Sequence, residues 1–290
     1  MKIIATHDGA FHTDEVCAVA LLQLYLESKN IQYQVVRTRD KEIREQADFV
    51  LDMGGVFDAT LCRFDHHQHG GAGKHPLSDT DYATCGLIWA TYGMELCGNN
   101  QETWDYIESK ICIPVDAFDN GIILNKDQGI FPQITLGEII SGFNRKEIDE
   151  NDHLFANAVT YAKQVFSNII ETGKYQMHCK EVAREIVSEH PDDSIIIIDE
   201  YLDLVDELII YPWVTIFVYP KGNRWRAKCV RSSQNGFATR VLFPEKWYGL
   251  RDEYLEEASG IKDLVFCHRA GFTIAARTKE AILEAIKFAK

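Results

Sequence analysis

Short apolar runs, each followed at once by acidic or histidine side chains, constrain the fold of this chain more than any other feature. The runs and the side chains that follow them are Lys2–Thr6 with His7, Phe49–Leu51 with Asp52, and Ile111–Val115 with Asp116. Runs of this length are typical of buried strands, and the loops that leave the carboxyl ends of parallel strands meet at one crevice. The recurrence therefore predicts an open parallel α/β sheet with potential ligands along one edge.

Helical and strand patterns fill the spaces between these runs. Apolar residues recur at helical spacing over Asp14–Leu26, Ile31–Val36 is expected to form a second strand, and Lys41–Ala47 a short helix. This alternation of strand and helix favours a parallel sheet. Further helices are expected at residues 78–96, 103–109 and, almost without interruption, 136–189.

A break in the helical pattern at His190-Pro-Asp-Asp-Ser194 marks the expected domain boundary. Residues 1–190 would form the larger domain, and residues 191–290 a smaller α/β domain. In the second domain, strands are expected at 195–198, 214–219 and 225–230, with a closing helix at 279–289. A chain of 290 residues is long enough for two domains of these sizes.

The net charge of −14 limits what the chain can bind. Phosphate backbones reward clustered Lys and Arg, so an acidic chain does not resemble a general nucleic-acid coat. It can still act on nucleic acid if metal ions supply the local positive charge. One segment departs from the overall balance, because Lys221–Arg240 carries six basic and no acidic residues. That segment is either a surface for an anionic substrate or an ordinary solvated strand.

Cysteine usage and the start of the chain predict the compartment. The eight cysteines lie in mostly apolar surroundings without a Cys-x-x-Cys pair, which predicts reduced core residues rather than disulfides. The sequence begins directly with an expected strand and shows neither a signal-peptide pattern nor an apolar stretch of membrane-spanning length. These features predict a cytoplasmic protein without membrane contact, and they do not indicate an oligomeric state.

The densest group of potential ligands is Asp65, His66 and His67. A carboxylate beside two imidazoles suits a divalent ion and an anionic substrate, although three such residues alone could also belong to a polar surface loop. The Gly-rich segment 70–78 that follows cannot hold regular structure. Because it lacks the Ser or Thr that a Walker phosphate-binding loop needs after its lysine, it is expected to be a flap over the site.

Several motifs, in the same order along nearly the whole chain, closely resemble those of the melanocyte-proliferating-gene (Myg) family. The motifs are His7-Asp-Gly-x-Phe-His12-x-Asp14-Glu15, Asp52-Met-Gly-Gly55, Phe64-Asp-His-His67, Asp116-Ala-x-Asp119-Asn-Gly121, Trp247-x-Gly-Leu-Arg-Asp252 and Phe266-x-His268-Arg-x-Gly-Phe272. This family belongs to the DHH phosphoesterases, which include RecJ-type exonucleases and manganese-dependent inorganic pyrophosphatases. A single Asp-His-His would be a weak signal, whereas this ordered set is specific.

The resemblance implies a DHH-type catalytic domain followed by a DHHA1-like substrate-binding domain. It also implies two Mn²⁺ or Mg²⁺ ions per chain, held by His7, His12, Asp14, Asp52, His66, Asp116 and Asp119. Asp52 would bridge the ions and His67 would lie near the scissile phosphate, so these two residues are the expected catalytic pair. The wider superfamily usually has Asp where this chain has His12, and the last motif offers both Asp116 and Asp119 as the final ligand.

For the substrate, the resemblance implies contacts from His67 in the first domain and from His268, Arg269 and Gly271 in the second. Gly271 would let the backbone approach the substrate closely, and His268 with Arg269 would donate hydrogen bonds to a phosphate or a 3′ end. An ordinary strand-to-turn connection with a surface arginine is the alternative.

The implied activity is that of a manganese-dependent hydrolase, similar to the 3′–5′ exonucleases that act on RNA among eukaryotic relatives. Two cations about 3.5–4 Å apart can activate a water and neutralise phosphoryl oxygens, and mixed imidazole and carboxylate donors favour Mn²⁺. A phosphatase of pyrophosphate or a nucleotide would use the same ions. A metal-binding interaction module without activity is a third alternative, but folding alone does not require so many acids and imidazoles in loops.

Overall fold

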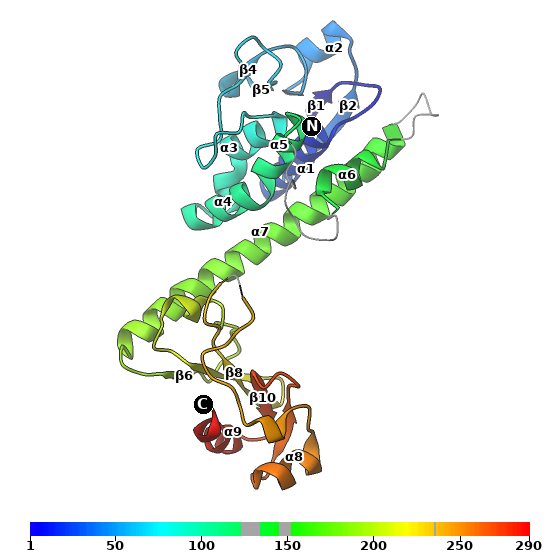
Figure 1. Ribbon diagram of the computed structural model, residues 1–290. Coiled ribbons are helices and arrows are strands. Elements are labelled where there is room, and N and C mark those ends of the chain that lie inside the picture. Colours follow the sequence, from blue (N-terminus) through cyan, green and yellow to red (C-terminus); the bar gives the residue numbers. More distant parts are fainter. Residues whose placement is uncertain (123–133, 145–151, 235) are drawn as a thin grey trace. The chain divides into compact units, whose positions relative to one another are not determined.

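The computed structural model describes residues 1–122, 134–144, 152–234 and 236–290 (Figure 1). The chain divides into two units, Met1–Tyr175 and Gln176–Lys290. This division falls inside the long helix α7, Asp152–Glu189, whereas the sequence suggests a boundary at 190/191. The second half of α7 belongs to the second unit because its apolar side chains, Cys179 and Val187 among them, join a hydrophobic core with Phe217.

The first unit is built on a five-stranded sheet in the order β2-β1-β3-β5-β4. The bounds of its strands are β1 Lys2–Thr6, β2 Tyr33–Arg37, β3 Phe49–Leu51, β4 Phe57–Asp58 and β5 Arg63–Phe64. Strand β1 pairs in parallel with β2 and β3, and β3 pairs in parallel with β5, whereas β4 runs antiparallel to β5. The predicted parallel sheet is therefore confirmed, and three of its parallel strands end at residues of the expected site.

The predicted strand at Ile111–Val115 is wrong. Residues Glu108–Cys112 form a turn of π-helix, and Ile113–Asp119 continues as the α-helix α5. A short apolar run cannot be told from a buried helical segment by its periodicity alone, and Pro114 in the first turn is a common signal for a helix start. The place expected for this strand in the sheet is taken by β5, which ends directly before Asp65.

Seven α-helices of the first unit and of the junction lie in the described residues. Their bounds are α1 Thr13–Ser28, α2 Lys41–Gln46, α3 Thr84–Leu96, α4 Gln101–Ile107, α5 Ile113–Asp119, α6 Leu136–Ser141 and α7 Asp152–Glu189. The helix expected from residue 78 thus begins only at Thr84. Of the stretch expected to be almost wholly helical, residues 145–151 lie outside the described part of the chain.

Alternating side chains give the two faces of the first sheet different neighbours. Ile4, Leu51 and Phe64 belong to the main core, which α1, α3 and the first half of α7 complete. Ala5 and Val50 point to the other face, where a small cluster forms around Ala47 at the end of α2. Most helices therefore pack on one face, and the carboxyl ends of β1, β3 and β5 lie at an edge that the helix N-termini approach (Figure 1).

The second unit carries another five-stranded sheet, in the order β6-β7-β8-β10-β9. Its elements are β6 Ile195–Ile197, β7 Ile216–Lys221, β8 Arg224–Cys229, α8 Asp252–Ser259, β9 Leu264–Cys267, β10 Thr273–Ala276 and α9 Lys279–Ala285. Only the β6–β7 pair is parallel among these described strands. The predicted strands at 195–198, 214–219 and 225–230 and the closing helix are found within a few residues of the expected positions.

None of the described helices is long and apolar enough to cross a membrane, the 38-residue α7 included. The cytoplasmic location stays a prediction. All eight cysteines are free thiols, and all but the half-buried Cys62 are buried, in keeping with reduced core residues.

Candidate metal centre

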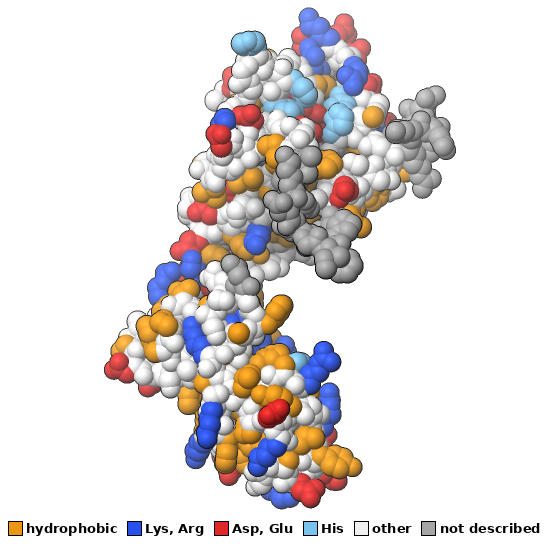
Figure 2. All heavy atoms as spheres, in the orientation of Figure 1, with side chains coloured by type: hydrophobic (Ala, Val, Ile, Leu, Met, Phe, Trp, Pro, Cys, Tyr) orange, Lys and Arg blue, Asp and Glu red, His pale blue; other side chains and the backbone are white. Residues whose placement is uncertain are grey.

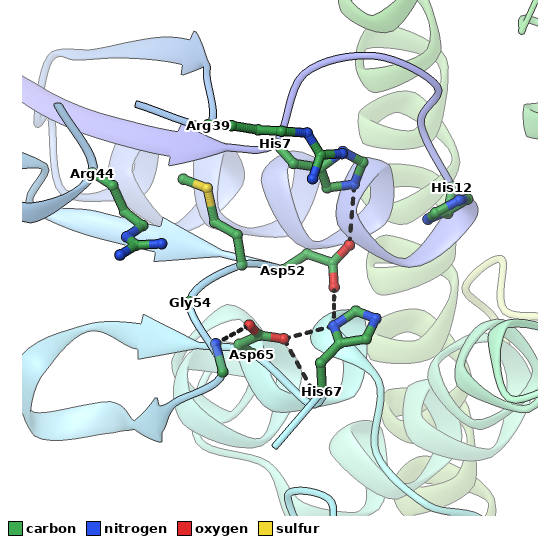
Figure 3. A pocket seen from close by; sticks show the side chains of 10 residues that line it. His7, His12, Arg39, Arg44, Asp52, Gly54, Asp65 and His67 are labelled. Carbon is green, nitrogen blue, oxygen red and sulfur yellow. Dashed lines mark hydrogen bonds and ion pairs between the residues drawn. The ribbon is translucent and has the colours of Figure 1, made fainter. Parts of the chain in front are cut away.

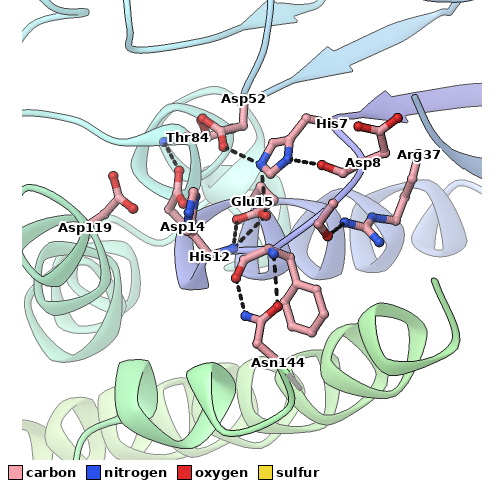
Figure 4. Close-up of polar contacts among 12 residues, drawn as sticks. His7, Asp8, His12, Asp14, Glu15, Arg37, Asp52, Thr84, Asp119 and Asn144 are labelled. Carbon is pink, nitrogen blue, oxygen red and sulfur yellow. Dashed lines mark hydrogen bonds and ion pairs between the residues drawn. The ribbon is translucent and has the colours of Figure 1, made fainter. Parts of the chain in front are cut away.

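The carboxyl edge of the first sheet gathers the predicted ligands from three strands. His7 follows β1, Asp52 follows β3, and Asp65 to His67 follow β5 (Figures 3 and 4). Histidine side chains gather around acidic ones on the face of the first unit seen in Figure 2. Asp52 has a φ of +55°, a left-handed conformation that turns the chain sharply at the end of β3.

Asp52 lies at the centre of the cluster. Its Oδ2 is 3.3 Å from His7 Nε2, while its Oδ1 is 3.5 Å from both His66 Nε2 and His67 Nδ1. Thr84, at the start of α3, donates its hydroxyl hydrogen to Asp52 Oδ1 at 3.1 Å. The two carboxylate oxygens thus face different imidazoles, and the hydroxyl fixes the carboxylate between them.

The N-terminus of α1 supplies further acids. Glu15 is fully buried, accepts hydrogen bonds from the His12 backbone N–H at 2.7 and 2.8 Å, and lies 3.1 Å from His7 Nε2. Asp14 is also fully buried and accepts a 3.3 Å hydrogen bond from the Thr84 backbone N–H. The turn before the helix is held by Asn144, which exchanges hydrogen bonds with the Phe11 backbone (Figure 4).

Three groups of side chains in the described residues have ligand atoms within 4.8 Å of one another. The groups are His7 with His12, Glu15 and Asp52; Asp52 with His66 and His67; and His12 with Asp14 and Asp119. They overlap, because Asp52 belongs to two of them and His12 to two. The arrangement brings together six of the seven predicted metal ligands with His67 and with Glu15.

Two buried atoms in this cluster have no hydrogen-bond partner among the described residues, namely Asp14 Oδ1 and His66 Nε2. His66 Nε2 is 3.5 Å from an oxygen of Asp119 and 3.8 Å from Asp14 Oδ2. Buried polar atoms are nearly always satisfied in native proteins, so each exception calls for an explanation. Both atoms are potential ligand atoms for a cation, and their residues belong to two different groups among the three.

The electrostatics of the cluster show its strong attraction for positive charge. Although burial lowers the pKa of His7, hydrogen bonds to Asp52 and Glu15 raise it to about 10. Burial, followed by the charges of Asp52 and Glu15, raises the pKa of Asp14 well above its usual value. Burial would raise the pKa of Asp52 as well, but the neighbouring His66 and His7 lower it. Protons on His7 and Asp14 balance charge that a divalent ion could balance instead.

Asp116, the remaining predicted ligand, lies apart from these groups. It is fully buried, and its carboxylate accepts hydrogen bonds from the backbone N–H groups of Ala83 at 2.8 Å and Gly86 at 3.0 Å and from His75 Nε2 at 2.9 Å. His75 Nδ1 in turn is 2.6 Å from an oxygen of Glu108. A Cβ atom at Gly86 would lie 2.1 Å from Asp116 Oδ2, so this close approach requires glycine.

Asp116 lies on α5 and caps the first turn of α3. Asp119, at the end of α5, is the residue that reaches the candidate centre. The expectation that Asp116 converges with the other ligands does not hold. Its oxygens already accept hydrogen bonds from the chain itself, and a negative charge is stabilised at a helix N-terminus.

His67 is exposed, with 62% of its side chain accessible to solvent, and so is His12. Asp65 orients it, because one carboxylate oxygen lies 2.8 Å from His67 Nδ1 and 3.0 Å from the His67 backbone N–H. The other oxygen accepts the Gly55 N–H at 2.5 Å. With Nδ1 directed at Asp65, the second ring nitrogen of His67 is free to face a substrate.

A pocket of about 400 Å³ opens beside the cluster (Figure 3). Its walls are formed by His7, His12, Arg39, Arg44, Asp52, Met53, Gly54, Gly55, Asp65 and His67. Acidic and imidazole groups thus line one part of the wall, and two arginines line another.

The predicted substrate contacts of the second unit lie at the turn between β9 and β10. His268 is half-buried, packs against Phe272 with 4.3 Å between the centroids of the tilted rings, and accepts the Ala270 N–H at Nδ1. Arg269 is exposed. Gly271 has a φ of +69°, and a Cβ atom there would lie 2.2 Å from the Tyr248 ring, so glycine is required for packing as well as for the turn.

The basic segment Lys221–Arg240 is partly used within the second unit. Lys228 pairs with Asp203 at 2.8 Å and Arg231 with Asp206 at 2.9 Å. Arg240 donates to backbone carbonyl groups, including that of Tyr211 at 2.7 Å. These contacts favour a structural role for part of the segment over a wholly free basic surface.

The residues that sequence patterns missed are mostly those that support the ligands. Glu15 stands inside the first motif and could have been found as an acid beside Asp14. Thr84 and Glu108 lie far from any motif, and no local pattern marks them. His75 was visible as a polar residue near the His cluster, but its partners Glu108 and Asp116 were not.

Comparison with known proteins agrees with the resemblance seen in the motifs. Residues 3–289 match the family model MYG1_exonuc, described as "Uncharacterised protein family (UPF0160)". An MYG1 protein of Schizosaccharomyces pombe is 30% identical over 311 residues, which cover 97% of this chain and 95% of the relative. The MYG1 exonuclease of Homo sapiens is 30% identical over 323 residues, which cover 97% of this chain and 83% of the relative.

Among solved structures, similarity is found to RecJ of Thermus thermophilus in complex with Mn²⁺, with a TM-score of 0.28 and 13% identity over 99% of this chain and 51% of that one. A structure of exonuclease RecJ bound to manganese gives a TM-score of 0.29 and 12% identity over 99% of this chain and 88% of that one.

Proposed function

The chain belongs to the MYG1 family, and we propose that it is a metal-dependent phosphoesterase that shortens RNA or short oligonucleotides from the 3′ end. The observation that carries the proposal is a pair of buried ligand atoms without a hydrogen-bond partner among the described residues, Asp14 Oδ1 and His66 Nε2. Each unsatisfied buried polar atom costs about 1–3 kcal/mol. Divalent cations at the candidate centre would satisfy these atoms, whereas a cluster with a purely structural role would be expected to pair them internally.

The donors around Asp52 support a pair of cations. Asp52 Oδ2 faces His7, which groups with Glu15, and Oδ1 faces His66, which lies near Asp14 and Asp119. His12 lies within ligand distance of members of both sets. A carboxylate whose two oxygens face separate donor sets suits a bridging ligand. Mixed imidazole and carboxylate donors favour Mn²⁺ over Mg²⁺, which prefers oxygen alone.

The same donors fit hydrolysis of a phosphodiester. Bound divalent cations would lower the pKa of an attacking water and balance the negative charge that builds up on the phosphoryl oxygens. In the reaction, the water oxygen bonds to phosphorus, the ester P–O bond breaks, and the leaving oxygen takes a proton. We assign His67 to hold that proton at its exposed ring nitrogen, with Asp65 fixing the orientation of the ring at 2.8 Å.

In the second unit, we propose that the turn at His268 to Gly271 contacts the substrate. Arg269 is exposed, and its planar guanidinium can donate two hydrogen bonds to a phosphate. The tight turn at Gly271 would let the backbone lie close to the bound substrate. Arg269→Ala should then raise KM for an oligonucleotide more than it changes the affinity for Mn²⁺. An unchanged KM in this variant would remove the turn from the substrate site.

A second candidate function is a phosphatase of pyrophosphate or of a nucleotide. The pocket of about 400 Å³ beside the cluster favours it, because this volume is within the range of small-molecule sites. A metal-binding module without activity is disfavoured by the exposed, oriented His67, for which such a module has no use.

Parallel assays on the purified full chain separate these candidates. The substrates are single-stranded RNA labelled at the 5′ end, the same RNA labelled at the 3′ end, single-stranded DNA and pyrophosphate, each with Mn²⁺, with Mg²⁺ or with a chelator. We expect Mn²⁺-dependent release of the 3′ label before the 5′-labelled strand shortens to its end. Activity that survives chelation, or cleavage of pyrophosphate alone, would contradict the proposed exonuclease.

A further inference from the structure

We propose that Arg44, assisted by Arg39, forms a phosphate-binding subsite beside the candidate metal centre. The ligand would be a phosphate group of the substrate next to the one that is attacked, so the inference rests on the proposed function. Both arginines line the pocket that also contains Asp52 and His67 (Figure 3). The subsite and the candidate centre therefore belong to one cavity of the first unit.

Arg44 has a guanidinium group that the chain does not use. In the part of the chain that the structure describes, no hydrogen bond or ion pair is formed by its side chain, although the residue is half-buried. Two other arginines of the same unit behave differently: Arg37 pairs with Asp152 at 2.8 Å, and Arg63 donates to backbone carbonyls such as that of Ala47 at 3.1 Å. A half-buried guanidinium without an internal acceptor is suited to an anion from outside.

The stem of Arg44 runs along the turn after β3. Its Cδ and Nε lie 3.8 and 3.9 Å from the position that a Cβ atom would have at Gly54, so the arginine stem lies beside this turn. Gly54 and Gly55 have φ values of +103° and +68°, which favour glycine at both positions. Gly54 and Gly55 therefore add no side chain to the pocket wall, and Met53 is the residue of this turn whose side chain lines it. The cavity of about 400 Å³ leaves room for a phosphate.

Arg39 adds a second positive charge at the rim of the pocket. Its Nε is 2.9 Å from an oxygen of Asp8, and 69% of its side chain is exposed. This pairing holds the guanidinium in place and neutralises part of its charge, so we assign it the smaller share of the binding. The planar fork of a guanidinium matches two oxygens of one phosphate. Without such groups, the carboxylates of the cavity would repel the negative charge of the phosphate.

The subsite predicts how a strand lies in the cavity. The attacked phosphate would lie at the candidate centre near Asp52 and His67, and the neighbouring phosphate would reach Arg44. A substrate with a single phosphate could use only one of these positions at a time. Arg44 would thus favour ligands with at least two phosphate groups, such as a dinucleotide with a terminal phosphate or pyrophosphate.

The test compares Arg44→Ala and Arg44→Lys with the wild-type chain and with Lys41→Ala as a control. Lys41 lies on the same helix α2, is 74% exposed and is absent from the pocket wall, so its removal changes the net charge equally without touching the subsite. Isothermal titration at fixed Mg²⁺ measures the binding of inorganic phosphate, which has no bond to hydrolyse, and of pyrophosphate. Phosphate released from pyrophosphate is measured in parallel, so that any turnover is separated from binding. Titration of the phosphate-free protein with Mn²⁺ measures the metal centre separately.

We expect Arg44→Ala to weaken pyrophosphate binding on the order of 10- to 100-fold, as for the loss of a charge-assisted hydrogen-bonded pair. Arg44→Lys should recover part of the affinity, and Lys41→Ala should bind like the wild type. The affinity for Mn²⁺ should stay within about twofold in all of them, since none is a metal ligand, and circular dichroism should show an unchanged fold.

Unchanged phosphate and pyrophosphate affinity in Arg44→Ala, or no binding to the wild-type chain, would overturn the subsite. The outcome is independent of the proposed activity. If the chain hydrolyses RNA and Arg44→Ala binds pyrophosphate normally, only the subsite fails. If no phosphodiester is hydrolysed but binding depends on Arg44, the subsite stands and the proposed exonuclease fails.

Discussion

Helix α5 carries two carboxylates, Asp116 and Asp119, that belong to two different clusters. Both clusters consist of acidic and histidine side chains, but the contacts around the two carboxylates differ in length. Around Asp116 the contacts are short: His75 and two backbone N–H groups donate to it at 2.8–3.0 Å. Around Asp119 they are long, with 3.5 Å to His66, whose Nε2 has no hydrogen-bond partner among the described residues. The first cluster is closed by the chain, and the second is open to a cation.

Residue type alone therefore does not identify a metal centre. Both clusters contain buried acids and a buried histidine with a raised pKa: about 10 for His7 and about 9 for His75. For both, burial lowers the pKa and hydrogen bonds to carboxylates raise it. What distinguishes Asp116 from Asp119 is whether the chain itself supplies donors to the carboxylate at short hydrogen-bond distance. Glu108 Oε2 is the exception in the closed cluster, since it lacks a partner among the described residues.

The largest effect is expected for Asp52→Asn in the open cluster. The variant keeps the shape of the side chain but removes the negative charge that faces both donor sets, so kcat should fall by orders of magnitude while the fold survives. Turnover at limiting Mn²⁺ and thermal unfolding measure the two properties. Normal turnover in a purified, folded variant would refute the central position of Asp52. Asp79→Asn is the control, because that carboxylate is 96% exposed and outside the cluster.

For the closed cluster, His75→Ala should act on stability. Its removal leaves Glu108 and Asp116 buried without their imidazole partner, which should lower the free energy of unfolding by about 3–5 kcal/mol. Urea denaturation of the metal-free chain measures the loss, with the exposed His69→Ala as the matched control. Should the variant fail to fold, His75→Gln keeps a donor and should recover part of the stability.

A His75→Ala protein of normal stability that no longer binds Mn²⁺ would contradict the distinction between the two clusters. In that case the closed cluster would be part of the metal centre, and the distinction drawn from hydrogen bonding would be wrong.

A smaller effect separates the two carboxylates of α5 directly. Asp119→Asn should weaken Mn²⁺ binding on the order of 10- to 100-fold. It should change the unfolding free energy of the metal-free chain little, because the 3.5 Å contact of Asp119 with His66 is too long to stabilise the fold strongly. Asp116→Asn should do the reverse. Calorimetric titration with Mn²⁺ and urea denaturation of both variants measure these effects, and equal effects of the two substitutions would show that α5 serves one cluster only.

Much of the first unit could be predicted from the sequence. The runs before His7 and Asp52 are strands, as their length and the polar residues after them indicate, and the parallel pairing places both residues at one edge. Strands β4 and β5 have two residues each, too few for any periodicity to register. The Ile111–Val115 run has the composition of a strand but continues a helix. A short apolar run of this kind fits a buried strand and a buried helical segment equally well.

The supporting contacts could not be predicted because they join distant parts of the chain. Helix α3 begins at Thr84 and not near residue 78. At this helix start, the backbone N–H groups of Ala83 and Gly86 donate to Asp116, and that of Thr84 donates to Asp14. No local rule fixes a helix start by carboxylates that lie 33 positions later and 70 positions earlier in the chain. The same holds for the choice between Asp116 and Asp119, which depends on where α5 packs rather than on the motif.

The most direct test of the account is the position of Mn²⁺ itself. Crystals of the full chain grown with Mn²⁺ and measured at its absorption edge give an anomalous difference map that locates the ions without reference to activity. We expect peaks within coordination distance of Asp52, with His66 and Asp119 among the ligands. A peak between Asp116 and His75, or no peak near Asp52, would contradict the assignment of the open cluster as the metal centre.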